Sequence, residues 1–77
     1  MKKVQILGTG CAKCQKLTEN AQEAAKVLGI DIELEKVTDL VDIMKFGILS
    51  TPGLVIDGQL ISAGKLLQPD EIVPHLR

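Results

Sequence analysis

Two cysteines stand three positions apart within residues 8–14, which read Gly8-Thr9-Gly10-Cys11-Ala12-Lys13-Cys14. The apolar, β-branched run before them ends at a glycine, and this pattern predicts a strand that enters a turn. From Cys11 onward, apolar residues recur at helical spacing as far as Leu28. Gly29 can then end the helix, because glycine readily adopts the left-handed conformation found at helix C-termini. We therefore expect a strand, a tight glycine turn in which both glycines serve the bend, and a long helix that opens at the cysteine pair.

Residues 30–37 alternate between apolar and polar side chains, which is typical of a second strand with one face more exposed to solvent. Thr38 or Asp39 can then cap a short helix that runs through Met44. Met44 and Phe46 are expected to pack in the core or at its rim. Because a helix joins the first two strands, we expect these strands to be parallel.

The last third of the chain predicts a hairpin and a final helix. Asp57-Gly58 separates two short apolar runs and is a strong signal for a two-residue hairpin turn. Pro69 suits the first position of the last helix, and Pro74 inside that helix should keep it short or kinked. The expected order is β-α-β-α-β-β-α, an α/β fold with a four-stranded mixed sheet between helices.

The composition bounds the size and the partners of the protein. The chain has 77 residues, 45% of them hydrophobic and 1% aromatic, with a net charge of −1. We expect one domain, residues 1–77. The near absence of rings and of a basic stripe argues against nucleic-acid partners. No segment is long and apolar enough for a membrane span or a signal-peptide core, so we expect a cytoplasmic protein without a membrane partner. We also expect a monomer.

The two cysteines are too few for the disulfide framework of a small secreted domain, so the pair indicates redox chemistry or metal binding. One helical turn brings both sulfurs within bonding reach. Cys14 lies on the apolar stripe and should be shielded, whereas Cys11 lies beside unpaired helix amides. Those amides, together with Lys13, predict a lowered pKa for Cys11.

An exposed thiolate with a shielded partner suits thiol–disulfide exchange. Cys11 would attack a substrate disulfide, and Cys14 would then attack the Cys11 sulfur and release the reduced substrate. This cycle requires no metal and no organic cofactor. It does require an external electron donor, such as a flavoprotein disulfide reductase or glutathione.

A soft-metal carrier for copper or zinc is the alternative. Heavy-metal-associated domains also place C-x-x-C at the start of a helix, but they usually carry Met at the position of Thr9, and their element order is β-α-β-β-α-β. No Asp, His or further Cys stands near the pair, so zinc binding would require a dimer. The expected order of elements therefore favours redox chemistry over metal transport.

With these features, the sequence resembles the thioredoxin superfamily over nearly its whole length. It is most similar to the small prokaryotic thioredoxin/glutaredoxin-like proteins called redox-active disulfide proteins. The resemblance implies a thioredoxin-like fold and a thiol–disulfide oxidoreductase that acts on protein disulfides. It also implies that Pro52 is the cis proline that faces the cysteine pair, and that the backbone of Thr51 binds an extended substrate segment.

The sequence departs from typical thioredoxins around the cysteines. Gly10 replaces the usual Trp, and Ala12-Lys13 replaces Gly-Pro between the two cysteines. Gln5 stands where thioredoxins carry a buried Asp, and an amide cannot act as the proton acceptor for the second thiol. The residues that bind glutathione in glutaredoxins have only a partial counterpart here, so the resemblance assigns no glutathione dependence.

Overall fold

The computed structural model describes all residues, 1–77, and its elements follow the expected order. They are β1 (Lys2–Leu7), α1 (Ala12–Leu28), β2 (Ile32–Val37), α2 (Leu40–Lys45), β3 (Gly53–Ile56), β4 (Gln59–Ala63) and α3 (Pro69–Leu76). The four strands form one sheet in the order β2-β1-β3-β4. β1 pairs in parallel with β2 and antiparallel with β3, and β3 and β4 form an antiparallel hairpin. The expected mixed α/β sheet is confirmed.

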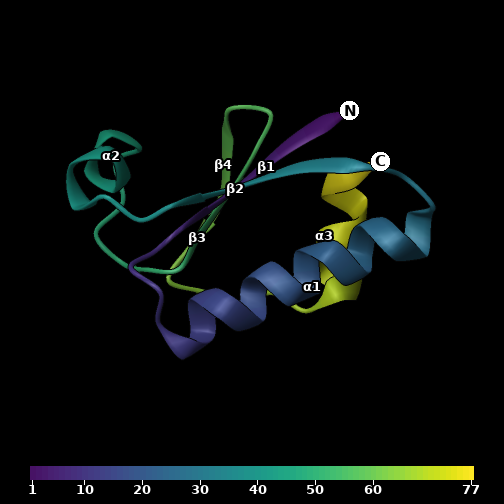
Figure 1. Ribbon diagram of the computed structural model, residues 1–77, viewed down its shortest axis with the longest axis horizontal. Coiled ribbons are helices and arrows are strands. Elements are labelled where there is room, and N and C mark those ends of the chain that lie inside the picture. The colour runs from purple at the N-terminus through teal and green to yellow at the C-terminus, as the bar shows by residue number, and fades with distance from the viewer.

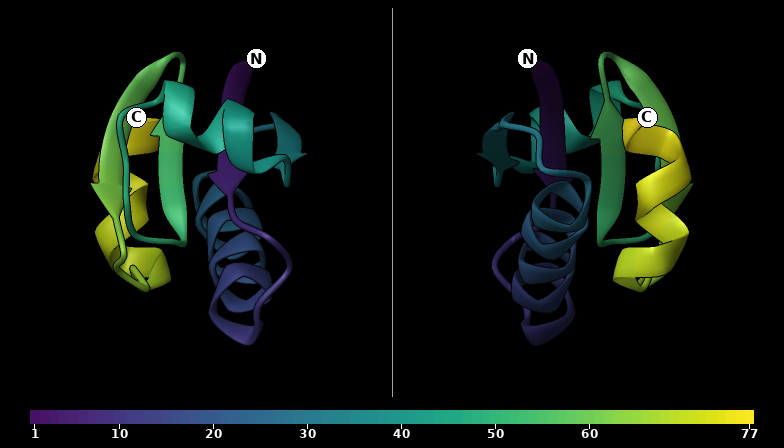
Figure 2. Two further views of the ribbon diagram at one scale, coloured as in Figure 1. Left: turned by 90° about the vertical axis from the view of Figure 1, so that its left-hand side faces the viewer. Right: turned by 90° about the vertical axis from the view of Figure 1, so that its right-hand side faces the viewer.

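Helices cover both faces of this sheet. α1 and α3 share one core with β1 and β3, whereas α2 packs against the opposite face of the same two strands. Figure 1 shows α1 crossing α3, and Figure 2 shows α2 well apart from α1. The start of α1, where the cysteines lie, is therefore mounted on the face that also carries α3.

The boundaries of α1 differ slightly from the expected ones. The helix begins at Ala12, and Cys11 is its N-cap with an extended backbone. At the other end, Gly29 adopts φ 68° and caps the helix as predicted. The amide of Ile30 still donates to the carbonyl of Ala25 at 3.1 Å. β2 consequently starts at Ile32 and not at Ile30, because Ile30 is occupied in closing the helix.

The hairpin and the last helix confirm the predictions at the C-terminal end. Asp57 and Gly58 both have positive φ, at 50° and 81°, as a primed two-residue turn requires. α3 starts at Pro69 and spans eight residues with Pro74 inside it, so it is short as expected. None of the helices combines the length and the apolar composition that crossing a bilayer demands.

Candidate redox site

The two cysteines form a disulfide at the N-terminus of α1, with their Cα atoms 5.1 Å apart. Cys11 is exposed, while Cys14 keeps only 5% of its surface accessible. The backbone amide of Cys14 donates to Cys11 Sγ at 3.2 Å, which makes the sulfur of Cys11 a cap for the helix. The predicted difference in exposure is therefore confirmed, and an N–H group points at the exposed sulfur.

The glycine turn before Cys11 contains two glycines with different functions. Gly10 adopts φ 95° and serves the bend, as predicted. Gly8 lies outside the left-handed region and is buried against the cysteine pair. A Cβ atom at Gly8 would collide with Cys14 Sγ and would lie 3.2 Å from Cys14 Cβ. Gly8 does lie in the bend that leads to Cys11, but its position requires glycine for space and not for backbone conformation.

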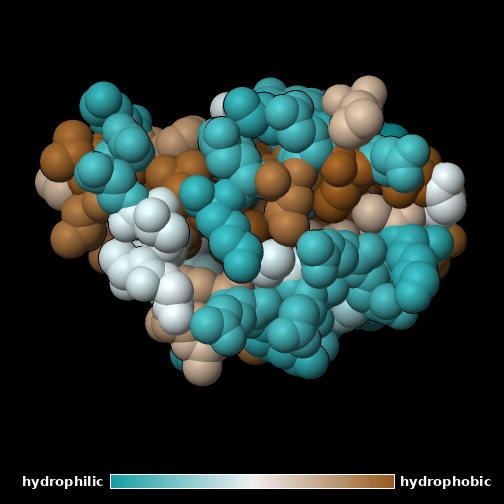
Figure 3. Space-filling model, in the orientation of Figure 1, coloured by the Kyte–Doolittle hydropathy of each residue, from teal (hydrophilic) through white to brown (hydrophobic).

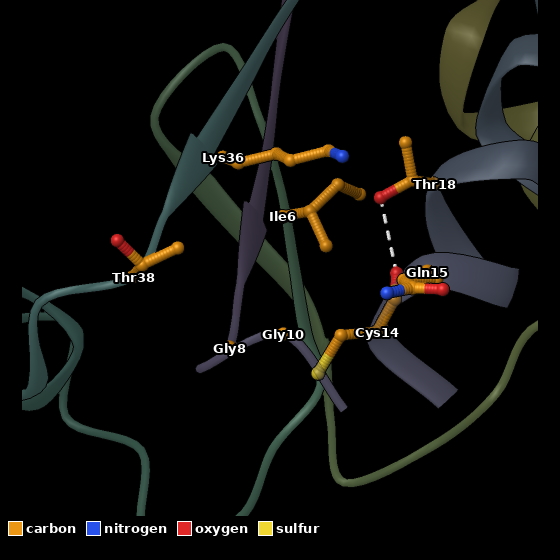
Figure 4. A pocket seen from close by; sticks show the side chains of 8 residues that line it. All are labelled: Ile6, Gly8, Gly10, Cys14, Gln15, Thr18, Lys36 and Thr38. Atoms are coloured by element: carbon orange, nitrogen blue, oxygen red, sulfur yellow. Dashed lines mark hydrogen bonds between the residues drawn. The ribbon is translucent and has the colours of Figure 1, made fainter. Parts of the chain in front are cut away.

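A small pocket of about 80 Å³ opens beside Cys14 (Figure 4). Its lining comes from β1, from β2 and the residue that follows it, from the glycine turn and from the first turns of α1: Ile6, Gly8, Gly10, Cys14, Gln15, Thr18, Lys36 and Thr38. The hydroxyl of Thr18 donates to the carbonyl of Cys14 at 3.0 Å. Apart from Cys14, the only ionisable side chain in this lining is Lys36, so no carboxylate lines the pocket beside the buried cysteine.

Gln5 points away from the cysteine pair. Its side-chain amide donates to Glu35 Oε1 at 2.7 Å, and both residues line a second depression near Phe46 of the α2 side. Ile6, the next residue of β1, faces the pocket behind Cys14 instead. Successive side chains of a strand point to opposite faces, so the Gln5–Glu35 pair lies across the sheet from the sulfur.

Thr51 and Pro52 lie in the loop before β3 and are joined by a cis peptide bond. The Cβ position built on Gly8 lies 3.9 Å from Thr51 Cβ, so this loop reaches the same corner of the fold as Cys14. Pro52 is buried, and its carbonyl accepts from the amide of Gly64 at 2.8 Å. Thr51 is exposed, and no backbone hydrogen bond of a turn, loop or cap involves it.

Lys13 and His75 are both exposed, and no cluster of metal-binding side chains is present. Lys13 is exposed in the first turn of α1 and takes part in none of the three salt bridges. His75 is exposed on α3. No three His, Cys, Asp or Glu side chains gather to form a candidate metal centre. Nothing in the structure therefore favours the soft-metal alternative.

Sequence reasoning located the cysteine pair but missed the contact between Gly8 and Cys14. A glycine that provides space and a glycine that provides a turn look the same in a sequence. The available signal was the position of Gly8 directly after an apolar strand, where burial is expected. That signal is too weak to name Cys14 as its neighbour.

Known proteins resemble this chain over nearly its whole length. A family model described as a thioredoxin domain matches residues 2–77. A thioredoxin of Methanothermobacter thermautotrophicus is 49% identical over 72 residues, which cover 94% of each chain. A thioredoxin of Methanocaldococcus jannaschii is 39% identical over 74 residues, which cover 96% of this chain and 85% of that one.

A solved structure supports the fold independently. It is described as thioredoxin-2, a component of the protein secretion machinery of the malaria parasite, and it superposes with a TM-score of 0.70. The match covers 99% of this chain and 81% of that chain, at 16% sequence identity. With the strand order and the C-x-x-C disulfide already established, these matches confirm the resemblance read from the sequence: the chain belongs to the thioredoxin domain family.

Proposed function

We propose that this protein exchanges disulfides with protein substrates, with Cys11 as the nucleophile and Cys14 as the resolving thiol. Its function as a thiol–disulfide oxidoreductase rests on its family and on the C-x-x-C disulfide. The separate roles of the two cysteines rest on the difference in their surroundings. The proposal treats residues 1–77 as a single thioredoxin-like domain.

The observation that carries the assignment is the contrast in exposure between two bonded sulfurs. A substrate disulfide can reach Cys11, which is exposed, but cannot reach Cys14, which is buried. The amide of Cys14 already points at Cys11 Sγ at 3.2 Å, and it would stabilise a negative sulfur there. Lys13 adds a nearby positive charge. The first attack therefore belongs to Cys11.

The reaction then proceeds in two balanced exchanges. The thiolate of Cys11 attacks one sulfur of the substrate disulfide, forms a mixed disulfide and releases the other substrate sulfur as a thiolate. Cys14 loses its proton and attacks Cys11 Sγ, which releases the second substrate thiolate and leaves the Cys11–Cys14 disulfide. The substrate gains two electrons and two protons, and the protein loses the same number.

The loop at Thr51 and Pro52 is the proposed substrate-binding element. Thr51 is exposed close to Cys14, and its backbone groups have no partner among the turns, loops and caps. An extended substrate segment could pair with those groups in the manner of an added strand. Such pairing would hold the segment that flanks a substrate disulfide beside Cys11.

The proposal extends to the electron donor and the setting. A flavoprotein disulfide reductase would restore the dithiol after each cycle, since the exchange itself consumes both thiols. We propose that the protein works as a monomer in the cytoplasm, where such reduction is sustained.

Two cysteine variants test the assignment by reduction of a model protein disulfide with dithiothreitol as the donor. Cys11→Ser should reduce the rate to the uncatalysed background, because no accessible sulfur remains. Mixed with the substrate after dithiothreitol has been removed, Cys14→Ser should accumulate a mixed disulfide through Cys11, detectable as a mass adduct that added dithiothreitol removes. Val27→Ser, at the exposed far end of the same helix, serves as the control and should retain full activity. Full activity in Cys11→Ser would contradict the proposal.

A further inference from the structure

Of the seven glycines, Gly8 is the only one at which an added Cβ atom would meet a cysteine sulfur. Gly8 is buried at the end of β1, and the side chain of Cys14 extends toward its turn (Figure 4). A Cβ atom built on Gly8 collides with Cys14 Sγ. The backbone of Gly8 lies outside the left-handed region, so other residues could adopt it. The reason for glycine at this position is therefore the space that the sulfur fills.

Neither side of this contact can easily withdraw. The amide of Gly8 donates to the carbonyl of Val37 at 2.9 Å and so continues the pairing of β1 with β2. On the other side, α1 is held against the sheet by Leu17 and Ala21, which have no accessible surface. A shift of the helix away from Gly8 would open a gap in that packing, which protein interiors tolerate poorly.

We propose that Gly8 is a positioning residue of the redox site: its missing side chain provides the space that the Cys14 sulfur occupies in the disulfide and thereby sets how readily the disulfide forms. The inference rests on the proposed function of the Cys11–Cys14 pair, which it deepens. In the disulfide, the bond to Cys11 holds Cys14 Sγ in place next to Gly8. In the dithiol, that bond is absent, and the Cys14 side chain can turn away from an added methyl group.

The direction of the effect follows from this difference. In the exchange with glutathione, the Cys11–Cys14 bond breaks and the disulfide bond of oxidised glutathione forms. Both cysteines end as thiols that carry the two protons from two glutathione thiols. Gly8→Ala penalises the disulfide more than the dithiol, so the equilibrium moves toward the dithiol. The protein becomes a stronger oxidant.

The first experiment measures this equilibrium in glutathione redox buffers, with wild type, Gly8→Ala and Gly10→Ala. We expect Gly8→Ala to shift the equilibrium constant about tenfold toward the dithiol, which corresponds to a potential about 30 mV more positive. Gly10→Ala is the matched control. Its added Cβ would meet nothing within 4 Å, although φ 95° makes it costly for the fold in both redox forms alike. Its equilibrium constant should stay within about threefold of wild type.

The second experiment compares the free energy of unfolding of the disulfide-bonded and the reduced chains. Gly8→Ala should cost clearly more in the disulfide-bonded chain than in the dithiol chain, and its cost in a Cys14→Ala background, which lacks the sulfur, should be no larger than in the dithiol chain. If Gly8→Ala alone does not fold, the same substitution in the Cys14→Ala chain decides the question. Folding in that background supports the inference, and failure to fold there overturns it.

Three results on folded protein would overturn the inference. These are a shift smaller than about threefold in Gly8→Ala, a shift toward the disulfide, and an equal shift in Gly10→Ala. Neither experiment uses a protein substrate. An active enzyme with an unchanged potential would therefore reject only the role of Gly8, whereas a chain that equilibrates with glutathione but reduces no protein disulfide would reject the proposed function.

Discussion

The two faces of the sheet bury very different numbers of residues. The face under α1 and α3 has eleven buried residues: Val4, Ile6, Leu17, Ala21, Ala24, Ala25, Leu54, Ile56, Leu67, Ile72 and Leu76. The face under α2 has four: Leu7, Ile43, Ile48 and Val55. We call the face under α1 and α3 the deep face and the face under α2 the shallow face. α1, which carries the cysteine pair at its start, lies on the deep face. The site is thus mounted on the part of the fold that resists movement most strongly.

The shallow face leaves apolar surface uncovered. Leu40, Val41 and Met44 of α2 are each more than 60% exposed, and Leu49 in the following loop is 98% exposed. Figure 3 shows apolar surface over the α2 end of the molecule. The expectation that Met44 packs in the core or at its rim is therefore wrong, whereas Phe46 does pack at the edge of the small cluster. α2 is anchored mainly by Ile43, because six residues make too few turns to bury more.

The strongest test of this contrast replaces one anchor on each face with alanine. Leu17→Ala should lower the free energy of unfolding by about 3–5 kcal/mol, because the surrounding deep core cannot collapse into the cavity. Ile43→Ala should cost about 2–3 kcal/mol, since α2 can settle toward the sheet. Denaturant unfolding of the oxidised protein measures both. Equal costs would show that the two faces contribute alike and would break the comparison.

A smaller effect on the free energy of unfolding is expected for Asp57, which lies in the hairpin turn at the end of the sheet and belongs to neither core. The amide of Lys3 donates to Asp57 at 2.9 Å, and Lys2 Nζ lies 3.2 Å from the same carboxylate. Both contacts hold the pKa of Asp57 below its ordinary value, and the hydrogen bond from the Lys3 amide has the larger effect. The ionised carboxylate therefore stabilises the folded state above the unfolded pKa, about 3.9, and this contribution is lost as the pH falls through the folded pKa.

Asp57→Asn tests that contribution, because asparagine tolerates the positive φ of the turn and removes only the charge. Wild type should be more stable than the variant at pH 5–7, by less than either core substitution costs. The difference should shrink as the pH is lowered below about 4. Urea unfolding across this range supplies the measurement. A difference that stays constant down to pH 2 would exclude the carboxylate as its source.

The smallest effect is expected on the uncovered surface of α2. Met44→Ser should change the free energy of unfolding by no more than about 0.5 kcal/mol, because the side chain is 61% exposed. Thermal unfolding beside Ile43→Ala provides the comparison on the same helix. A loss as large as that of Ile43→Ala would mean that Met44 contributes to the core after all.

Much of the fold could be predicted from local patterns. The parallel pairing of β1 with β2 followed from a helix between two strands, and the hairpin followed from Asp57-Gly58. The helix start was nearly right, since Cys11 caps α1 and Ala12 opens it. The start of β2 was missed by two residues. That error arose because the amide of Ile30 still closes the helix, which apolar alternation cannot reveal.

The sequence by itself determined the order of the elements, the C-x-x-C pair at a helix start and the class of chemistry, because spacing along the chain controls each of these. Only the tertiary structure decided that Gly8 lies against the Cys14 sulfur and that Gln5 turns to the opposite face of the sheet. These relations join segments far apart in the chain, or depend on which face of a strand a side chain takes. They are fixed by how the helices and loops pack on the sheet, and no local pattern records that packing.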